Sequence, residues 1–585
     1  MKTRVKRRVR TNQQLAAELS KEVNLSPMVT EFLCDKGYNT KESILHFTQF
    51  TAPQLRKVSR MKDGSAFIER FARAVKNGQN IVIFADYDGD GVSSAAIFIW
   101  TLRWLGVKAN YFISNRFTEG YGISVKAMDR LIEKYPDTDL IITCDNGVVA
   151  FDGVNYAKEK GIDVIVSDHH TASPDGRQPD CPVVCENRLD EDTESREGFC
   201  GAELSRRLCF ALVYYLGKWE ELKEKMELLY SFSGFATITD VIDLNAANHF
   251  VAKKGIELIN KSRNLLKIPC WQALKEVAEV REVSEVTFGY HYGPMINAAG
   301  RILGDASIAV DLFIEEDKAK AIELVLKLQE INKVRQDKAL EQQNHAKLEM
   351  KIKGLEKDKF IIVSGLTEEN VDYEEGIAGL IAAFIVENYK KPAICLCKTE
   401  NAGVFKGSAR SVEGFNLKAA LDECSELLLG YGGHPMAAGL SIQEENIELL
   451  REKLNQLADH TNELEEVIEI DYLSKPEEMS VELAEQYKEV LMPFGKGFEK
   501  PVFATYGIFD ASYRVMKEKH IKTKLVLNDQ KVEMLWFNSM TQMEKLKPVN
   551  KKILVVGEPG VNVFNGRETL QIIANRVIML DEEKF

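Results

Sequence analysis

Several features that mark particular classes of protein are missing from this sequence of 585 residues. No apolar run is long enough to cross a bilayer, and no apolar stretch of the signal-peptide type follows the basic N-terminus. The chain has no internal repeat and no low-complexity segment. These absences argue against membrane-spanning, secreted and repeat proteins. We therefore expect a cytoplasmic protein with no membrane partner.

The cysteines do not have the spacing of a disulfide framework. The ten cysteines are scattered, so we expect reduced thiols and not disulfides. Cys181 and Cys185, with Cys200 and Cys209, have a spacing loosely like that of a zinc site. A second close pair is missing, and we do not expect zinc there.

The net charge is −13, which at first argues against a nucleic acid as partner. The local field decides whether a polyanion binds, however, and carboxylates that hold metals can account for much of the negative charge. The segment Met1–Arg10 carries six basic side chains. It could contact phosphates or could be a solvated terminus, and the sequence leaves both readings open.

The length predicts several domains, because a single hydrophobic core stops growing well below this size. From about residue 80 to about residue 260 strands alternate with helices, which predicts a doubly wound parallel sheet. The proline-free run Glu315–Lys357 predicts a long connecting helix, followed by a second α/β unit. Short strands after about residue 465, with a hairpin turn at Asn565-Gly566, predict a barrel of the oligonucleotide-binding (OB) type.

These patterns together predict an α/β protein with five parts. They are an N-terminal helical and basic segment (1–75), a doubly wound catalytic domain (76–314), a connecting helix (315–358), a second α/β domain (359–464) and an OB-like β-barrel for nucleic-acid binding (465–585).

Acidic residues and histidines follow three apolar runs that we expect to be strands. Asp86, Asp88 and Asp90 follow Ile81–Phe84. The other two runs are Leu140–Cys144, which Asp145 follows, and Val164–Ser167, which the triplet Asp168-His169-His170 follows. The carboxyl ends of parallel strands share one crevice, where so many carboxylates would repel each other unless cations lay between them. The pattern therefore predicts a metal site.

The ligand types also indicate the metal and the chemistry. Aspartate together with histidine favours Mn²⁺ or Mg²⁺ over a thiolate zinc site. Two such ions, with a bridging carboxylate such as Asp145, suit the hydrolysis of a phosphodiester. Asp240, at the edge of another apolar stretch, is a further candidate ligand. A single aspartate after a strand is usually a helix cap, but independent caps would not also place two adjacent histidines there.

These motifs resemble those of the DHH phosphoesterase superfamily and, within it, the RecJ family of single-stranded-DNA exonucleases. The resemblance runs from about residue 80 to the C-terminus in the family's order. Beyond the strand-end motifs it rests on Asn115–Phe117, Glu119–Gly122, Gly293–Arg301, Lys406–Ser411, Gly432–Gly439 and Pro493–Gly495.

The resemblance implies a role for each matching residue. The metal ligands would be Asp88, Asp90, Asp145, His169 and Asp240, with Asp86 and Asp168 as ligands or as residues that orient them. His170 would contact the scissile phosphate, and Arg301 and His434 would hold phosphate oxygens. The 5′-terminal phosphate and the DNA strand would be bound by Arg116, Ser408 and Arg410, with Asn297, Lys406 and Gly433 in the same motifs.

The activity implied is 5′→3′ hydrolysis of single-stranded DNA to mononucleotides, in recombination and repair. A single-strand-binding protein and a helicase are the partners that the family suggests. Two alternatives stay open: a DHH phosphodiesterase acting on short oligoribonucleotides or cyclic dinucleotides, and an inactive single-strand-binding subunit.

The chain departs from the family pattern at three places. Phe84 stands where RecJ proteins commonly have a histidine, so one metal site could lack a ligand. Gly89 replaces a bulkier residue, and Glu186-Asn187-Arg188 stands where Asn-Pro is more typical. These changes fit a divergent or mobile-element member of the family.

Overall fold

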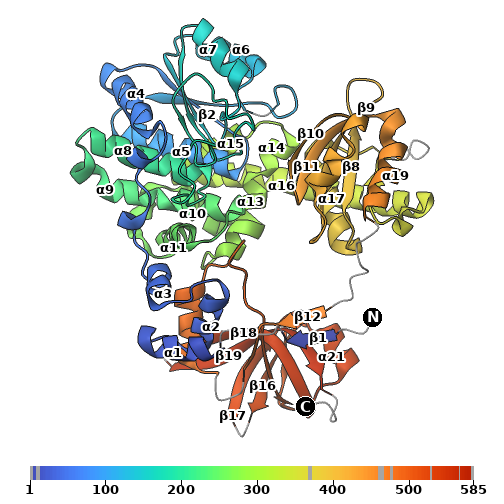
Figure 1. Cartoon of the computed structure of the whole chain (residues 1–585). Helices are drawn as coiled ribbons and strands as arrows, with labels where there is room; N and C mark the ends of the chain where they lie inside the picture. The colour runs from blue at the N-terminus through green and yellow to red at the C-terminus, as the bar shows by residue number, and fades with distance from the viewer. Residues whose placement is uncertain are drawn as a thin grey trace.

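The computed structural model describes residues 4–7, 13–120, 122–365, 372–458, 467–474, 479–527, 530–564 and 567–580. The predicted hairpin turn at Asn565-Gly566 and most of the basic segment Met1–Arg10 lie outside these ranges. Two α/β domains lie side by side above a β-barrel (Figure 1). In the described part of the chain, no helix combines the length and the apolar character that crossing a membrane requires.

Four helices precede the first large sheet: α1 (Gln13–Val23), α2 (Pro27–Asp35), α3 (Lys41–Thr48) and α4 (Gly64–Asn77). Helices α1 to α3 lie beside the barrel, whereas α4 lies against the first α/β domain (Figure 1). Strand β1 (Arg4–Arg7) pairs in parallel with β12 (Val467–Ile470), just before the barrel. The N-terminal segment therefore connects the upper and the lower parts of the molecule.

The first domain contains a parallel sheet of five strands in the order β3-β2-β4-β5-β6. Alternate residues of β2 point to opposite faces: Ile81 and Ile83 pack with α4, α5 and α8, while Val82 and Phe84 pack with α6 and α7. The doubly wound sheet is thus confirmed. Its elements are β2 (Ile81–Ala85), α5 (Gly89–Trp104), β3 (Ala109–Ile113), α6 (Val125–Lys134), β4 (Leu140–Cys144), α7 (Phe151–Glu159), β5 (Asp163–Ser167) and β6 (Val183–Val184).

The strand order places the ligand crevice. The chain goes from β2 outward to β3 and then returns to β4 on the other side of β2. Beside this switch point, between the carboxyl ends of β2 and β4, open α/β sheets bind their ligands. Asp86 and Asp88 follow β2 and Asp145 follows β4, so all three carboxylates lie at this crevice.

The prediction that strands continue to about residue 260 is wrong. After β6 the domain is helical, because short apolar runs such as Tyr230–Thr239 are buried on all sides as helices, a case that the apolar pattern alone does not separate from a strand. The helices are α8 (Gly201–Tyr215), α9 (Trp219–Leu228), α10 (Tyr230–Thr239), α11 (Ala246–Lys261), α12 (Cys270–Val277), the π-helix η4 (Thr287–Tyr292), α13 (Gly293–Ile296), α14 (Ala298–Ile302) and α15 (Ser307–Ile314).

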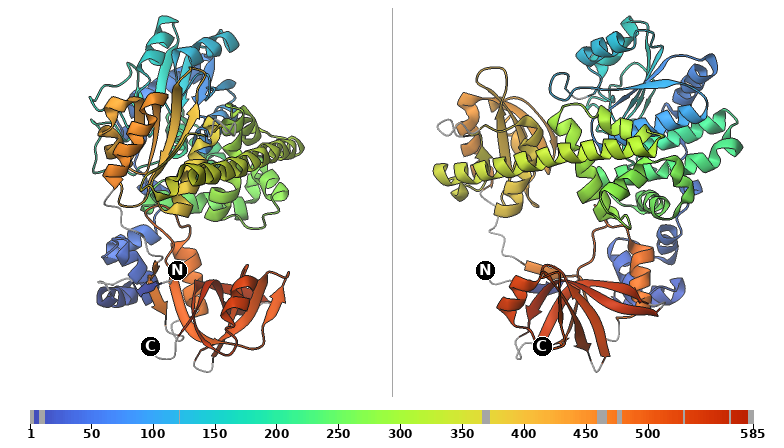
Figure 2. Two further views of the ribbon diagram at one scale, coloured as in Figure 1. Left: turned by 90° about the vertical axis from the view of Figure 1, so that its right-hand side faces the viewer. Right: turned by 180° about the vertical axis from the view of Figure 1, so that it is seen from behind.

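The long helix α16 (Lys318–Lys353) connects the two α/β domains, and the right-hand view of Figure 2, from behind, shows it crossing both of them. The second domain has a sheet in the order β10-β11-β9-β8-β7, in which only β7 and β8 are parallel. Its elements are β7 (Ile361–Val363), α17 (Glu375–Tyr389), β8 (Ala393–Lys398), β9 (Val404–Arg410), α18 (Leu417–Asp422), β10 (Leu428–His434), β11 (Ala437–Gln443) and α19 (Ile447–Leu457).

The C-terminal sheet has the order β13-β14-β18-β19-β17-β16-β15, and a further pairing of β14 with β16 brings its two sides together. This confirms the predicted barrel. The buried rings of Phe509 and Trp536 belong to its core. Its elements are β13 (Tyr472–Ser474), α20 (Val481–Gln486), β14 (Phe503–Phe509), β15 (Arg514–Met516), β16 (His520–Leu527), β17 (Gln530–Trp536), α21 (Met540–Leu546), β18 (Lys552–Phe564) and β19 (Arg567–Met579).

Candidate metal centre and adjoining arginine cavity

Three overlapping groups of metal-ligating side chains lie at the switch point of the parallel sheet. Within each group the ligand atoms are within 4.8 Å of one another. The first group consists of Asp86, Asp88 and Asp145. The second consists of Asp145 with His169 and His170, and the third of Asp90, His169 and Asp240. Every aspartate and histidine predicted as a ligand at this crevice, except Asp168, therefore belongs to at least one of these groups.

His169 lies at the centre of the cluster. Its Nε2 is 3.0 Å from Asp145 Oδ1 and 3.5 Å from the nearest carboxylate oxygens of Asp90 and Asp240. Asp240 reaches this position from the C-terminal cap of helix α10, not from a strand. The side chain of Asn187 donates to the backbone carbonyl of His169. Asn187, whose motif departs from the family pattern, thus still supports the central histidine.

Asp90 is held by the start of another helix. Its two carboxylate oxygens accept hydrogen bonds from the amides of Gly201 and Ala202, both at 2.7 Å, at the N-terminus of α8. A helix N-terminus stabilises a carboxylate through its amides and its dipole. Gly201 is required here, because a Cβ would lie 2.8 Å from that of Asp145. Helix α8 therefore positions two carboxylates of the cluster.

Asp168 orients its neighbours and is not part of a metal group in the described chain. Its Oδ1 accepts from the amides of His169 (2.7 Å) and His170 (3.1 Å) and lies 2.8 Å from His170 Nδ1. Its Oδ2 accepts from the amide of Val148 (2.8 Å). Of the two predicted roles, ligand or orienting residue, this geometry supports the second.

The local backbone at Asp145 is strained. Asp145 has φ of 62°, a left-handed conformation that few non-glycine residues adopt and that often occurs at functional sites. The next residue, Asn146, is buried and donates to the carbonyls of Cys144 (2.9 Å) and Phe84 (3.3 Å). The hydroxyl of Thr143 donates to the carbonyl of Asn146 at 2.7 Å. These bonds fix the turn that presents Asp145.

Burial and mutual repulsion disfavour the charged carboxylates. For both Asp86 and Asp90, burial is the largest cause of the pKa shift and the Asp88 carboxylate is the second. The pKa of Asp86 is raised well above its usual value, and the pKa of Asp90 is raised to about 7. Burial, followed by neighbouring carboxylates, likewise raises the pKa of Asp145, and that of Asp240 to about 9. A divalent cation would relieve this repulsion.

The donor set fits Mn²⁺ or Mg²⁺. It consists of carboxylate oxygens and imidazole nitrogen, and no metal-ligating group in the described ranges contains a cysteine. Burial and the nearby His170 lower the pKa of His169 to about 4, so its ring is neutral and able to coordinate. Asp86 Oδ1 is buried and has no hydrogen-bond partner among the described residues. A cation would supply that missing partner.

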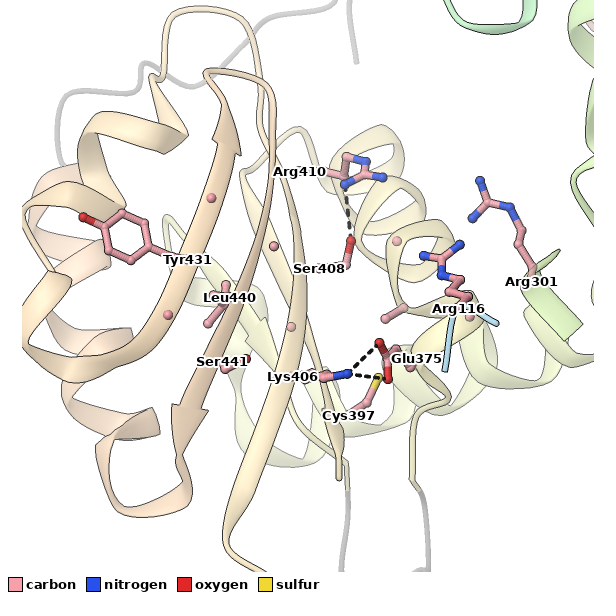
Figure 3. A pocket seen from close by; sticks show the side chains of 17 residues that line it. Arg116, Arg301, Glu375, Cys397, Lys406, Ser408, Arg410, Tyr431, Leu440 and Ser441 are labelled. Atoms are coloured by element: carbon pink, nitrogen blue, oxygen red, sulfur yellow. Dashed lines mark hydrogen bonds and ion pairs between the residues drawn. The ribbon is translucent and has the colours of Figure 1, made fainter. Parts of the chain in front are cut away.

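A second site, rich in arginine, adjoins the metal cluster. The guanidinium groups of Arg116, Arg301 and Arg410 line a cavity of about 420 Å³ between the two α/β domains (Figure 3). Burial, then Arg116, Arg335 and Arg410, lowers the pKa of Arg301 to about 10. Guanidinium groups gathered in this way repel each other unless an anion lies between them. The cavity therefore suits a phosphate, which arginine grips with two hydrogen bonds.

Ser408 lies on strand β9 with Arg410 and lines the same cavity. Arg410 Nη1 donates to Ser408 Oγ at 3.3 Å and to the carbonyl of Ala409 at 2.8 Å. Gly379 on α17 faces them, and a Cβ there would lie 3.0 Å from Ser408 Oγ and 3.0 Å from Arg410 Nη2. The absence of a side chain at Gly379 keeps this wall open.

The predicted residue Lys406 also lines the cavity, but it is already paired. Its Nζ lies 3.1 Å and 3.3 Å from the two carboxylate oxygens of Glu375, at the start of α17 (Figure 3). Glu375 was not predicted as a site residue, and neither was Arg335 on α16. Both lie in charged stretches without a distinctive spacing, so the sequence offers no signal for either.

Tyr87 connects the two sites. It lies between Asp86 and Asp88 in the chain, and the Arg116 guanidinium lies 5.1 Å from the centre of its ring. Gly300 packs against Tyr87 as well, since a Cβ there would be 2.9 Å from the Tyr87 carbonyl oxygen. Arg301 follows Gly300 directly. The residue that separates two metal-group carboxylates thus also contacts Arg116 and packs against Gly300, the residue before Arg301.

Besides Asp168, three predicted residues lie outside both the metal-ligating groups and the lining of the arginine cavity. His434 and Gly433 are exposed at the end of β10 and are not among the residues that line the arginine cavity. Gly433 has φ of 144°. Asn297 has a buried Oδ1 with no hydrogen-bond partner in the described ranges, and this oxygen would be 3.4 Å from a Cβ at Gly89. Asn297 therefore lies against the start of α5, next to the Asp88 cap.

Phe84 is a core residue in this structure. Its side chain is fully buried on the face of the sheet covered by α6 and α7, and its ring is 5.3 Å from that of Phe112. The three metal-ligating groups form without a histidine at this position. Glu186, in the other unusual motif, accepts from the amides of Gly198 (2.9 Å) and Phe199 (3.2 Å), just before α8.

The domains match known families. The N-terminal domain of the DHH family matches residues 80–231, the DHHA1 domain residues 358–459 and the RecJ OB domain residues 470–576. Together with the strand-end aspartates and the Asp-His-His triplet, these matches define a DHH-family protein with an OB domain.

Comparison with individual relatives shows which DHH-family proteins this chain is similar to. The single-stranded-DNA-specific exonuclease RecJ of Bacillus subtilis is 30% identical over 98% of this chain and 71% of its own length. That of Haemophilus influenzae is 31% identical over 88% of this chain and 90% of its own length. The crystal structure of Thermus thermophilus RecJ in complex with Mn²⁺ shares the fold, with a TM-score of 0.77 at 24% identity, over 99% of this chain and 80% of that one. The chain belongs to the RecJ family of single-stranded-DNA-specific exonucleases.

Proposed function

We propose that this protein is a metal-dependent exonuclease that degrades single-stranded DNA from the 5′ end and releases mononucleotides. The observation that carries the proposal is the contact of two unlike sites through Tyr87: a carboxylate and histidine cluster on one side, and an arginine cavity on the other. A strand whose terminal phosphate lies in the cavity would place its next phosphodiester at the metal cluster. Cleavage there would release one nucleotide at a time.

The metal cluster would hold two divalent ions, Mn²⁺ or Mg²⁺. Asp86, Asp88 and Asp145 would bind one, and Asp90, His169 and Asp240 the other, with Asp145 close enough to His169 to be shared. When bound, such ions supply an activated water and stabilise the negative charge of the phosphoryl group. Crystal structures of Thermus thermophilus RecJ are of complexes with Mn²⁺ and with Mg²⁺.

His170 would assist at the scissile phosphate. Burial acts to lower its pKa, but the hydrogen bond that its Nδ1 donates to Asp168 and the surrounding carboxylates raise the pKa to about 9, so the ring is positively charged at neutral pH. Asp168 holds Nδ1, which leaves the Nε2 end of the ring to donate to a phosphate oxygen. Arg301 would contribute a second positive charge from the cavity side.

End recognition would come from Arg116, Ser408 and Arg410, which line the cavity. The barrel would hold the incoming strand by stacking and phosphate contacts, as OB domains do. His434 is exposed at the end of β10, and Lys406 is paired with Glu375. Both side chains would contact phosphate oxygens only after the DNA strand has entered the site. A role in recombination and repair, with a single-strand-binding protein or a helicase as partner, rests on the family alone.

A single assay tests the proposal. Strands labelled at the 5′ or the 3′ end, with a 5′-phosphate or a 5′-hydroxyl, are incubated with Mn²⁺, with Mg²⁺ and with chelator. We expect metal-dependent release of labelled mononucleotides from the 5′ end and no digestion of a blunt duplex. Release from the 3′ end first would contradict the polarity.

The same assay separates the two alternative functions. A dinucleotide or cyclic dinucleotide cleaved much faster than a long strand would indicate a small-substrate phosphodiesterase. Binding of the strand with no shortening in Mn²⁺ would indicate an inactive binding subunit, although the retained carboxylates and histidines argue against that reading.

A further inference from the structure

The helix that carries Asp240 ends in an unfavourable backbone conformation. The amide of Val241 donates to the carbonyl of Ile238 at 3.3 Å, and that of Ile242 donates to Thr237 at 3.2 Å. These two bonds form a Schellman cap, in which the left-handed residue is usually glycine. Here that residue is Val241, with φ of 55°. A β-branched residue disfavours this conformation, so neighbouring structure must hold it.

The side chain of Val241 does not hold this backbone conformation in place, because it is 60% exposed. The contacts that stabilise the turn begin three residues later, at Leu244. The amide of Leu244 donates to the carbonyl of Lys496 at 2.8 Å, and the Leu244 side chain is buried. A Cβ at Gly495 would lie only 2.8 Å from Leu244 Cδ1, so the Gly495 backbone packs closely against the Leu244 side chain. Lys496 Nζ also lies 3.5 Å from Asp243.

Gly495 and Lys496 belong to the barrel linker, residues 493–498, which connects helix α20 to strand β14 within the C-terminal domain, and this linker is firmly packed. The Phe498 ring is stacked on that of Phe47 at 4.9 Å and lies edge-on to Phe32 at 5.0 Å. Just before the linker, a ring nitrogen of His249 on α11 is 3.0 Å from the carbonyl of Leu491. The linker is therefore a fixed support for the turn after Asp240.

The same turn also reaches the second carboxylate that neighbours His169. The buried side chain of Asn248 donates to the carbonyls of Asp243 and Glu197, both at 3.0 Å. Residues 197–200 lead directly into α8, whose first amide, that of Gly201, donates to Asp90 at 2.7 Å. Asp90 and Asp240 are thus both connected to one packed unit, which includes the barrel linker.

We propose that the linker 493–498 and the turn 241–245 act as a positioning unit, which holds Asp240, and through Asn248 also Asp90, in register with His169. Docking of the barrel linker would then set the geometry of one metal site. The unit acts through Asp240 and Asp90 and does not itself touch the substrate. Its role presupposes the metal site of the proposed function.

The strained valine makes the unit testable. If the linker contact is weakened, Val241 can relax toward the right-handed conformation that it prefers, and Asp240 shifts with it. Glycine adopts the left-handed conformation about as readily as the right-handed one. A glycine at position 241 would keep the cap in place without help from the linker.

The experiment compares Gly495→Val, Val241→Gly and the double variant in the full chain. Gly495 does not need a positive φ, so valine is compatible with its backbone and acts by displacing Leu244. Mn²⁺ is titrated into metal-free protein without DNA, and free Mn²⁺ is followed by electron paramagnetic resonance. We expect Gly495→Val to weaken one Mn²⁺ site about tenfold, Val241→Gly to leave it within about twofold, and the double variant to recover most of the loss.

The controls separate failure of this role from failure of the proposed function. Gly560→Ala, in β18, adds a methyl group that meets Gln571 at an ordinary 3.6 Å and should leave Mn²⁺ binding unchanged. Wild-type protein that binds no Mn²⁺ would overturn the metal site itself. If the wild type binds Mn²⁺ and Gly495→Val binds it equally well, only the positioning role is overturned. The positioning role is also overturned if Gly495→Val loses Mn²⁺ affinity and the added Val241→Gly change does not restore it. If Gly495→Val does not fold, Gly495→Ala is measured with the same criteria.

Discussion

The guanidinium of Arg116 lies over the ring of Tyr87, 5.1 Å from its centre, and so joins the anion cavity to the metal cluster. Tyr87 is the single residue between Asp86 and Asp88. A phosphate bound by Arg116 is therefore placed next to the carboxylates that would bind a metal. In the proposed function, this relationship would set the distance between the 5′ end of the bound DNA strand and the bond that is cleaved.

The arginine cavity should discriminate between a 5′-phosphate and a 5′-hydroxyl. Replacing Arg410 with alanine removes charge-assisted hydrogen bonds to the terminal phosphate, each worth about 1.5–3 kcal/mol. We expect kcat/KM for a 5′-phosphorylated strand to fall about 10- to 100-fold, with a much smaller change for a 5′-hydroxyl strand. Arg73→Ala, on the exposed face of α4, is the matched control. An unchanged end preference would remove Arg410 from this role.

Asp145→Asn should lose activity and gain stability. The variant removes a carboxylate shared by two metal-ligating groups, so cleavage should fall by more than about a hundredfold. The folded-state pKa of Asp145 is raised, chiefly by burial, so this carboxyl destabilises the metal-free protein at pH values above its unfolded pKa. We expect the metal-free thermal midpoint to rise by about 2–4 °C at pH 8.

The pH dependence checks the cause of that gain. A raised folded pKa destabilises above the unfolded pKa and has no effect below it, so the difference between variant and wild type should disappear toward pH 4. Calorimetry at pH 8 and pH 4 measures this. A midpoint unchanged at pH 8 would show that Asp145 is not under electrostatic stress.

The catalytic crevice was predictable because its signals are local. The runs Ile81–Phe84 and Leu140–Cys144 are short, apolar and closed by aspartates, and parallel strands bring such ends together. The helices after β6 were not predictable in the same way. A run such as Tyr230–Thr239 is apolar on every side, and only its packing against α5, α8 and α11 decides that it is a helix.

The supporting contacts of the site could not be predicted from the sequence. Asp90 is held by amides of Gly201 and Ala202, more than a hundred residues away, and no motif marks that pairing. Asp168 looked equally suited to bind metal or to orient its neighbours, and only its four short contacts distinguish the two. The position of Glu375 in the cavity wall depends on how the second domain packs against the first, which no sequence motif indicates.

Metal binding should strengthen as pH rises. Without metal, Asp90 and Asp240 have pKa values of about 7 and about 9, raised first by burial and then by neighbouring carboxylates. Below these values they hold protons that a cation must displace. We expect weaker Mn²⁺ binding at pH 6 than at pH 8 and net proton release. Isothermal titration calorimetry in two buffers with different ionisation enthalpies measures the protons released, and equal heats in both would contradict the prediction.

Glu375 should moderate the charge of the arginine cavity. Its ion pair with Lys406, at 3.1 Å, offsets one positive charge before any strand binds. Lys406→Ala should therefore cost less binding than Arg410→Ala, because the lost charge was already balanced. Glu375→Gln leaves Lys406 available to a phosphate, and we expect single-stranded DNA to bind about two- to fivefold more tightly at low salt, with a steeper dependence on salt concentration. Fluorescence anisotropy in chelator, across a salt series, measures both quantities without cleavage. In the double variant Lys406→Ala/Glu375→Gln the gain should vanish, and a gain that persists there would show that Lys406 is not the group released.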